Sequence, residues 1–203
     1  MTVAVFGPMA VGASREVVNR AAVDIIYKPL VGMPGPEEKE RASIIRQIVE
    51  AAVMTHLHPR LLIRIVVQES QAQGSMLAVA INGVCIALLD AGIQIRYTFA
   101  AAEVGLRVDK QLVVDPDSAD EEICGARALH VFRALPAKPA KPADAEEVED
   151  ILCSVTSGRF DEEGYWASLA CGRSAADKVL AFMRKHVGHH YERLAAGAAG
   201  NFA

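Results

Sequence analysis

The chain has 203 residues, of which 52% are hydrophobic, so it can form one sizeable core or two small packed domains. Its net charge of −4 excludes binding to nucleic acid through a general basic excess, so any RNA contact must come from a local patch. The apolar run from Met76 to Leu89 is interrupted by Asn82 and Gly83 and is too short to span a membrane. A cytosolic or nuclear protein is therefore expected.

The first half of the chain alternates short apolar runs with turns. The stretch 61–68 (LLIRIVVQ) places apolar residues at every odd position, which gives one apolar face, as in a strand. Pro36 followed by two glutamates is typical of the first turn of a helix. In chain order we expect strands at 2–6 and 23–28, a helix at 42–57, a strand at 61–68 and a helix at 74–91 that is apolar nearly all round. Because the first strand begins almost at residue 1, we also expect that an earlier hairpin is missing.

The second half begins with a predicted meander. Its expected strands are at 93–102, 104–108, 111–114, 126–135 and 148–156, followed by a terminal helix at 161–193. The stretch 136–144 repeats Ala-Lys-Pro and is predicted to be a solvated loop. The buried side of the terminal helix is expected to carry Tyr165, Leu169, Val179, Phe182, Met183 and Val187.

The turn before the central helix resembles an anion cradle. Gln73, Gly74 and Ser75 precede a helix whose free N–H groups could face a phosphate. The next residues, Met76 and Leu77, are apolar where a guanidinium would be expected. The cradle therefore lacks its cation.

Basic side chains flank this turn on either side. They are Lys39, Arg41, Arg46, Arg60 and Arg64. One interpretation is a solvated face whose aliphatic stems cover apolar surface, and the other is contact with the phosphates of RNA that passes by.

Metal and redox chemistry are not indicated. Cys85, Cys124, Cys153 and Cys171 form no Cys-x-x-Cys pair and are expected to be buried thiols. The histidines lack a carboxylate or thiol at ligand spacing, and the acidic residues between 109 and 122 are expected to serve as turn and capping residues. No metal or cofactor is therefore predicted.

Six segments carry a resemblance to a known family. They are 4–8 (AVFGP), 32–41 (GMPGPEEKER), 55–60 (THLHPR), 66–75 (VVQESQAQGS), 82–93 (NGVCIALLDAGI) and 112–116 (LVVDP). With these segments the chain resembles the RNase PH family and, within it, the non-catalytic ring subunits of the eukaryotic RNA exosome. The resemblance implies an α+β fold, with a ribosomal-protein-S5-like half at 1–95 and a second α+β half at 96–203 that contains the 136–144 loop.

The resemblance also implies where an active site would lie. Active members bind phosphate with a Gly-Gly-Thr-Arg-Thr turn, which corresponds here to residues 74–78, so Leu77 replaces the arginine. Their acid/base or metal-binding aspartate pair corresponds to Glu121 and Arg127, although a shifted alignment would bring Asp117 or Asp120 into place. A guanidinium cannot hold Mg²⁺ or transfer a proton near neutral pH, so phosphorolysis is not expected.

The expected function is that of a catalytically inert subunit that supports 3′–5′ RNA processing and degradation, including rRNA maturation. The resemblance implies a hetero-hexameric ring with other RNase PH-like subunits and cap subunits, RNA bound through the assembled complex, and location in the nucleus, nucleolus and cytoplasm. Purified alone, the chain is expected to be able to self-associate as a homodimer. Two alternatives stay open: a phosphorolytic 3′–5′ exoribonuclease with a rearranged site, and a stand-alone RNA-binding module.

Overall fold

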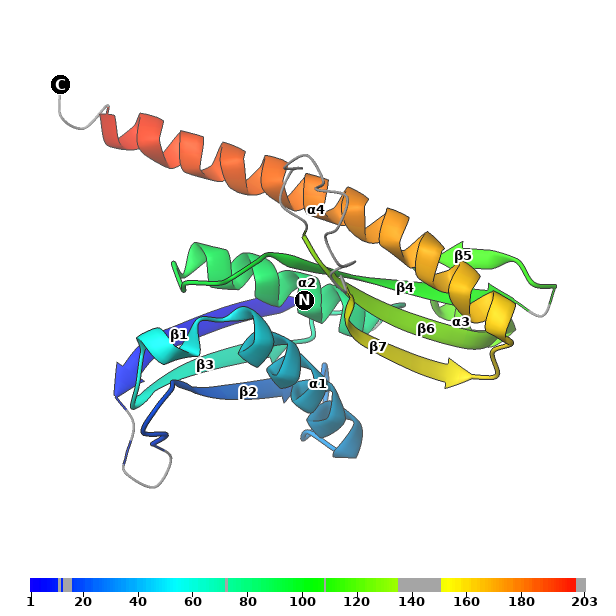
Figure 1. Ribbon diagram of the computed structural model, residues 1–203, viewed down its shortest axis with the longest axis horizontal. Coiled ribbons are helices and arrows are strands. Elements are labelled where there is room, and N and C mark those ends of the chain that lie inside the picture. The colour runs from blue at the N-terminus through cyan, green and yellow to red at the C-terminus, as the bar shows by residue number, and fades with distance from the viewer. Residues whose placement is uncertain (11, 13–15, 72, 108, 135–150, 200–203) are drawn as a thin grey trace, which may run out of the picture.

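The computed structural model describes residues 1–10, 12, 16–71, 73–107, 109–134 and 151–199. Two sheets lie on either side of a central helix, and a long terminal helix crosses the second sheet (Figure 1). In chain order the elements are β1 (Thr2–Ala10), β2 (Ala22–Lys28), α1 (Pro36–Ala52), the 3₁₀ helix η2 (Thr55–Leu57), β3 (Leu61–Gln68), α2 (Met76–Asp90), β4 (Phe99–Arg107), β5 (Leu112–Val114), α3 (Ser118–Ile123), β6 (Cys124–Arg133), β7 (Ile151–Gly158) and α4 (Glu162–Ala199).

The first sheet has the order β1-β3-β2, with β1 antiparallel and β2 parallel to β3. Along β3 the side chains of Ile63, Ile65 and Val67 are buried, whereas Arg64 and Gln68 on the opposite face are partly exposed. The parallel pairing requires a crossover, which α1 provides by packing against β2. One face of this sheet therefore contributes to the core and the other faces solvent.

The second sheet is antiparallel, in the order β5-β4-β6-β7. Both faces of its central strand β4 are covered, by α2 and by α4. α4 approaches closely at Gly172, where a Cβ atom would lie 3.2 Å from His130 of β6 and 3.5 Å from Val104 of β4. The 38 residues of α4 make a helix about 57 Å long, which extends beyond the sheet in Figure 1.

Helix α2 joins the two sheets into one hydrophobic core. Ile81, Val84 and Leu88 are fully buried in the cluster that also contains residues of both sheets. The side-chain amide of Asn82 donates to the carbonyl of Ala101 (2.9 Å) and its oxygen accepts from the Ala101 N–H (2.8 Å), which fixes α2 against β4. Within the described residues, no helix is both long and apolar enough to cross a bilayer.

Some predicted element bounds in the first half were wrong. β1 does not end at Gly7-Pro8, because the strand resumes its pairing with β3 after a register shift and runs to Ala10. The helix predicted for 42–57 begins at Pro36, where the sequence indicated a first turn, but it ends at Ala52 rather than at residue 57, and Thr55–Leu57 form η2. α2 is also less enclosed than its composition suggested, since Val79 is 46% exposed.

Other corrections concern the second half. The strands predicted at 93–102 and 104–108 are replaced by one strand, β4, which begins only at Phe99 and continues through Glu103 in its pairing with β6. On α4 the side chain of Phe182 is exposed, and smaller residues such as Ala176 take the buried positions instead. This helix also continues past residue 193 to Ala199, whereas the predicted loop at 136–144 lies outside the described residues.

Candidate functional site

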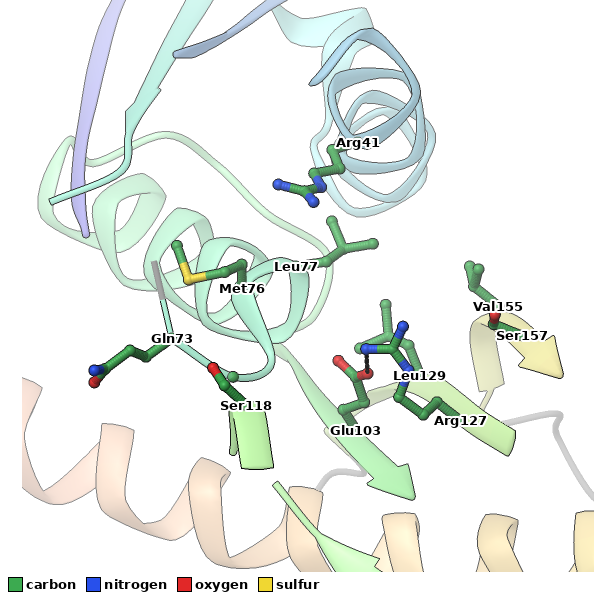
Figure 2. Close-up of a pocket in the computed structure, with 11 residues that line it drawn as sticks. Arg41, Gln73, Met76, Leu77, Glu103, Ser118, Arg127, Leu129, Val155 and Ser157 are labelled. Atoms are coloured by element: carbon green, nitrogen blue, oxygen red, sulfur yellow. Dashed lines mark ion pairs between the residues drawn. The ribbon is translucent and has the colours of Figure 1, made fainter. Parts of the chain in front are cut away.

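A pocket of about 400 Å³ opens beside the turn that begins α2, where the two sheets approach each other (Figure 2). Its walls come from both halves of the chain. The lining residues are Arg41, Gln73, Gly74, Met76, Leu77, Glu103, Ser118, Arg127, Leu129, Val155 and Ser157.

The turn that begins α2 is held against the loop between β5 and α3. Gly74 has φ +65°, and a Cβ atom there would lie 3.0 Å from the carbonyl oxygen of Pro116. Glycine is therefore required both for its backbone conformation and for the close approach. The next residue, Ser75, is buried, and its hydroxyl has no hydrogen-bond partner within the described part of the chain.

Arg41 of α1 reaches the pocket from the first sheet. Its Nη1 donates to Oε1 of Glu69 at 3.0 Å, and the same carboxylate oxygen accepts from the hydroxyl of Tyr27 at 2.6 Å. The guanidinium also lies 5.7 Å from the centre of the Tyr27 ring. Burial alone would lower the pKa of Arg41, but Tyr27 and Glu69 outweigh burial and raise that pKa. Arg41 is thus a fixed cation whose charge is partly neutralised by Glu69.

Arg127 of β6 and Glu103 of β4 form the opposite wall. Glu103 pairs in register with Leu129, so Arg127, two residues earlier, lies on the same face of the sheet as Glu103. Their charged groups are 3.9 Å apart, from Nη1 to Oε1. In Figure 2 Leu77 lies between Arg41 and this pair. The structure therefore brings together Leu77 and Arg127, the two residues that the sequence placed at family site positions.

Glu69 and Glu103 were not singled out from the sequence. Glu69 directly follows β3 in the same alternation as its buried residues, and it is only 7% exposed. A buried carboxylate needs a cation or several hydrogen-bond donors nearby. The position of Glu69 in the alternation of buried residues could therefore have identified it as a functional or structural carboxylate. Glu103 has no comparable signal, because only the register of β4 and β6 shows that it faces Arg127.

The other predicted basic residues do not line the pocket. Lys39 and Arg46 are exposed on α1, and Arg64 pairs with Asp24 across β3 and β2 (3.0 Å). Arg60 precedes β3 at the end distant from the turn, about 25 Å away along the strand, and pairs with Glu16 (3.4 Å). Of the five cations, Arg41 alone contributes to this pocket.

The aspartates that a shifted alignment would bring into the site have structural roles. Asp117 caps α3 by accepting hydrogen bonds from the backbone N–H groups of Ala119 (3.0 Å) and Asp120 (2.8 Å). Asp120 itself pairs with Arg107. The side chain of Glu121 lies outside the described residues. Among the side chains that are described, no three His, Cys, Asp or Glu residues form a group able to hold a metal ion.

Comparison with known proteins identifies the family. Residues 1–94 match the RNase PH family described as "3′ exoribonuclease family, domain 1". The Exosome complex exonuclease RRP46 homolog of Arabidopsis thaliana is 32% identical over 188 residues, which are 90% of this chain and 79% of that protein. The chain belongs to the RNase PH family.

Other RNase PH relatives agree with this assignment. The Exosome complex exonuclease RRP46 homolog of Oryza sativa is 26% identical over 89% of this chain and 78% of its own, and the Exosome complex component RRP46 of Saccharomyces cerevisiae is 25% identical over 89% and 82%. The crystal structure of rice Rrp46 superposes with a TM-score of 0.78 at 27% identity, covering 90% of this chain and 80% of that one. The predicted RNase PH-like α+β fold is therefore confirmed.

The described lining residues of this RNase PH pocket offer groups that can bind a ligand. Arg41 and Arg127 supply positive charge, and Gln73, Ser118 and Ser157 supply hydrogen-bonding groups. Among the described lining residues, Glu103 is the single carboxylate, and it is paired with Arg127. A phosphodiester or sugar could bind these groups, but an acid and a base placed to transfer protons are not found among them.

Proposed function

We propose that this RNase PH-family chain is a non-catalytic subunit of an exosome-type ring that supports 3′–5′ RNA processing and degradation, including rRNA maturation. One observation carries the proposal: Leu77 and Arg127 line the same pocket, at the positions where active members of the family are expected to carry an arginine and an aspartate. The names of the Arabidopsis, rice and yeast relatives support the assignment to an exosome.

Loss of phosphate binding follows from the start of α2. The helix N-terminus presents backbone donors, but Leu77 supplies no charge to hold an anion there. Arg41 does not replace the missing arginine, because its guanidinium is held by the carboxylate of Glu69. A phosphate at this turn would thus lack the bidentate partner that usually fixes it.

Loss of acid/base chemistry follows from the opposite wall. The guanidinium of Arg127 carries a positive charge and repels a divalent cation. Its partner Glu103 forms an ion pair with this guanidinium, at 3.9 Å, which competes with binding of Mg²⁺. Removing groups of this kind usually lowers a rate by about a hundredfold or more for each group. Here the arginine position holds Leu77, and one of the two aspartate positions holds Arg127.

We further propose that RNA contacts come from cations around the pocket. Arg41 and Arg127 line it, and Lys39 and Arg46 are exposed on the neighbouring helix α1. Such contacts to phosphates are independent of sequence, as a channel for varied RNA requires. The partners in this proposal are other RNase PH-like subunits in a six-membered ring and its cap subunits, in the nucleus, nucleolus and cytoplasm.

The decisive experiment incubates the purified chain with 3′-labelled single-stranded RNA, inorganic phosphate and Mg²⁺. We expect no release of nucleoside diphosphates above the background without protein. Affinity purification of the tagged chain followed by mass spectrometry should recover other RNase PH-like subunits. Robust diphosphate release by the lone chain, or recovery of the chain without any such subunit, would contradict the proposal.

The second candidate is a phosphorolytic exoribonuclease, because the plant relatives are named exonucleases. In that case Asp117 or Asp120 would have to supply the carboxylate. Asp117→Asn and Asp120→Asn variants of an active preparation test this directly, since each should then lose most of the diphosphate release. In the structure these side chains cap α3 and pair with Arg107, which favours the non-catalytic proposal.

A further inference from the structure

A second depression, of about 430 Å³, lies at the corner where β7 ends and α4 begins. It is separate from the pocket at α2, with which it shares no lining residue. Three aromatic rings and two carboxylates dominate its surface. The lining residues are Thr156, Gly158, Phe160, Asp161, Glu162, Tyr165 and Trp166.

The aromatic rings stand nearly perpendicular to one another. The ring centroids of Phe160 and Tyr165 are 6.4 Å apart at an interplanar angle of 87°, and those of Tyr165 and Trp166 are 5.6 Å apart at 72°. Trp166 is 59% exposed although it is a large apolar side chain. Edge-to-face rings of this kind form adjoining walls, and the electron-rich face of an aromatic ring attracts a cation.

The central ring of the three is held in place from behind. The hydroxyl of Tyr165 lies 3.3 Å from the Ser154 hydroxyl, which in turn lies 3.0 Å from Nδ1 of the buried His130. On the other side of the imidazole, Nε2 lies 3.2 Å from the Ser168 hydroxyl, which donates to the Tyr165 carbonyl at 2.7 Å. Tyr165 is thus fixed before any ligand arrives, which reduces the entropy lost on binding.

The charges around the rings are negative and only partly compensated. Asp161 accepts from Lys110 Nζ and from the Gly164 N–H, each at 3.0 Å, and these bonds, that of Lys110 foremost, lower the pKa of its carboxyl group. Glu162 is exposed and forms no ion pair within the described part of the chain. An unpaired carboxylate therefore stands beside three aromatic rings.

We propose that this depression, which we call the aromatic corner, binds the cationic side chain of a lysine or arginine from a partner protein. The cation would lie against the rings, and Glu162 would supply the opposite charge. Charge complementarity favours such an occupant over RNA, because Asp161 and Glu162 would repel a phosphate. The nearby Arg159 lines a neighbouring depression with Arg107 and Lys110, not the aromatic corner.

The sole tryptophan of the chain provides a direct readout, because Trp166 is one of the walls. The full chain is titrated with five-residue capped peptides of the form Gly-Ser-X-Ser-Gly, in which X is lysine, trimethyl-lysine, arginine or the neutral acetyl-lysine. We expect a saturable change in tryptophan fluorescence with the three cationic peptides and none with the acetyl-lysine peptide. Raising the salt concentration should weaken binding of the lysine peptide.

Variants on the first turn of α4 test the residues. Glu162→Gln should weaken binding of the lysine peptide by about two- to fivefold, as expected for losing one exposed ion pair. Glu163→Gln is the matched control, because Glu163 is the adjacent exposed carboxylate and does not line the aromatic corner. Trp166→Ala should abolish binding, measured by chemical shifts of the Thr156 and Gly158 amides because the fluorophore is lost.

Three outcomes would overturn the proposal. The first is an equal response to acetyl-lysine and lysine, and the second is an equal affinity in Glu162→Gln and the unsubstituted chain. The third is a tryptophan response to a single-stranded RNA oligonucleotide that disappears in Arg159→Gln, without a response to the cationic peptides. That last result would assign the corner to RNA.

Discussion

Arg127 and Glu103 lie on neighbouring strands of the second sheet and point into the same pocket, with 3.9 Å between Nη1 and Oε1. The pair joins β4 and β6 at the wall that faces the start of α2. Because Glu103 is only 13% exposed, its carboxylate depends on this wall for compensation of its charge. Loss of Arg127 should therefore destabilise this wall of the pocket.

Replacing Arg127 by aspartate should create a Mg²⁺ site. In Arg127→Asp two carboxylates face each other, so the thermal midpoint should fall without metal and recover in millimolar Mg²⁺. With a dissociation constant near 1 mM, 10 mM Mg²⁺ would restore about 1.4 kcal/mol. The unsubstituted chain and Arg127→Asn, which lacks the second charge, should show no such recovery in differential scanning fluorimetry.

Replacing Leu77 by arginine should restore phosphate binding at the α2 turn. Leu77→Arg places a guanidinium at the N-terminal end of α2 beside Gly74, so inorganic phosphate should raise the thermal midpoint of this variant. Val79→Arg is the matched control, because Val79 is exposed on the same helix but does not line the pocket. An equal response of both variants to phosphate would show that the turn has no special affinity.

The buried carboxylate of Glu69 should be important for stability. Glu69→Ala leaves the Tyr27 hydroxyl and the Arg41 guanidinium without their shared acceptor, so the free energy of unfolding should fall by about 2–4 kcal/mol. Glu37, which forms an ion pair with Arg41 at 3.8 Å, is 81% exposed, and Glu37→Ala should change stability by less than about 0.5 kcal/mol. Urea unfolding of the two variants measures the difference.

Two glycines with nearly the same positive φ allow the cost of backbone strain to be distinguished from the cost of a steric contact. Gly92 has φ +67° and no atom within 4 Å of the position that a Cβ would take, whereas Gly74 has φ +65° and the Pro116 carbonyl at 3.0 Å. Gly92→Ala should therefore cost only the conformational term, about 1–2 kcal/mol. Gly74→Ala should cost about 1–3 kcal/mol more, because backbone must move. Equal unfolding free energies for the two variants would mean that the loop yields freely.

The buried His130 should make stability depend on pH. Burial disfavours the imidazolium and lowers the pKa of His130, whereas an unfolded chain titrates near the ordinary value of about 6.5. Between these two pKa values the unfolded state binds more protons, so the free energy of unfolding must decrease as the pH falls through that window. Above pH 6.5 both states are neutral at this residue and the full stability is present.

The measurement compares slopes rather than absolute stabilities. Urea unfolding between pH 5 and 7.5 should give a shallower pH dependence for His130→Gln than for the unsubstituted chain. The histidines at 186, 189 and 190 are exposed on α4 and remain in both proteins, so their contribution cancels. A slope unchanged by the substitution would show that His130 is not responsible.

Local periodicity predicted most of the elements, because burial on one face imposes a pattern that can be read from the residues. The alternation at Ile63, Ile65 and Val67 predicted β3 with its observed bounds, and the apolar run before Asp90 predicted α2. Such a pattern does not show how the chain passes a turn. Gly7-Pro8 is typical of a strand end, yet pairing with β3 resumes at Met9. Whether the strand continues past this turn depends on its pairing with β3 and not on the local sequence.

Site residues that lie on one segment could be predicted from the sequence, whereas contacts that depend on strand pairing could not. The apolar replacement at Leu77 follows from the sequence of a single turn, and that turn lines the pocket. The partner of Arg127 cannot be identified in this way. Glu103 lies 24 positions earlier in the chain, and only the register of β4 with β6 places it beside Arg127. The basic residues were predicted to flank the turn, yet the length of β3 separates Arg60 from it.

Helix α4 connects places that are far apart on the molecule. It begins at the aromatic corner, and 29 residues after Glu162 the hydroxyl of Tyr191 donates to the carbonyl of Leu89 at the end of α2 (3.2 Å). These two points are about 44 Å apart along the helix axis. Between these points α4 is unbroken and packs against β4 and β6. A single helix resting on the second sheet therefore connects the aromatic corner with the far end of α2.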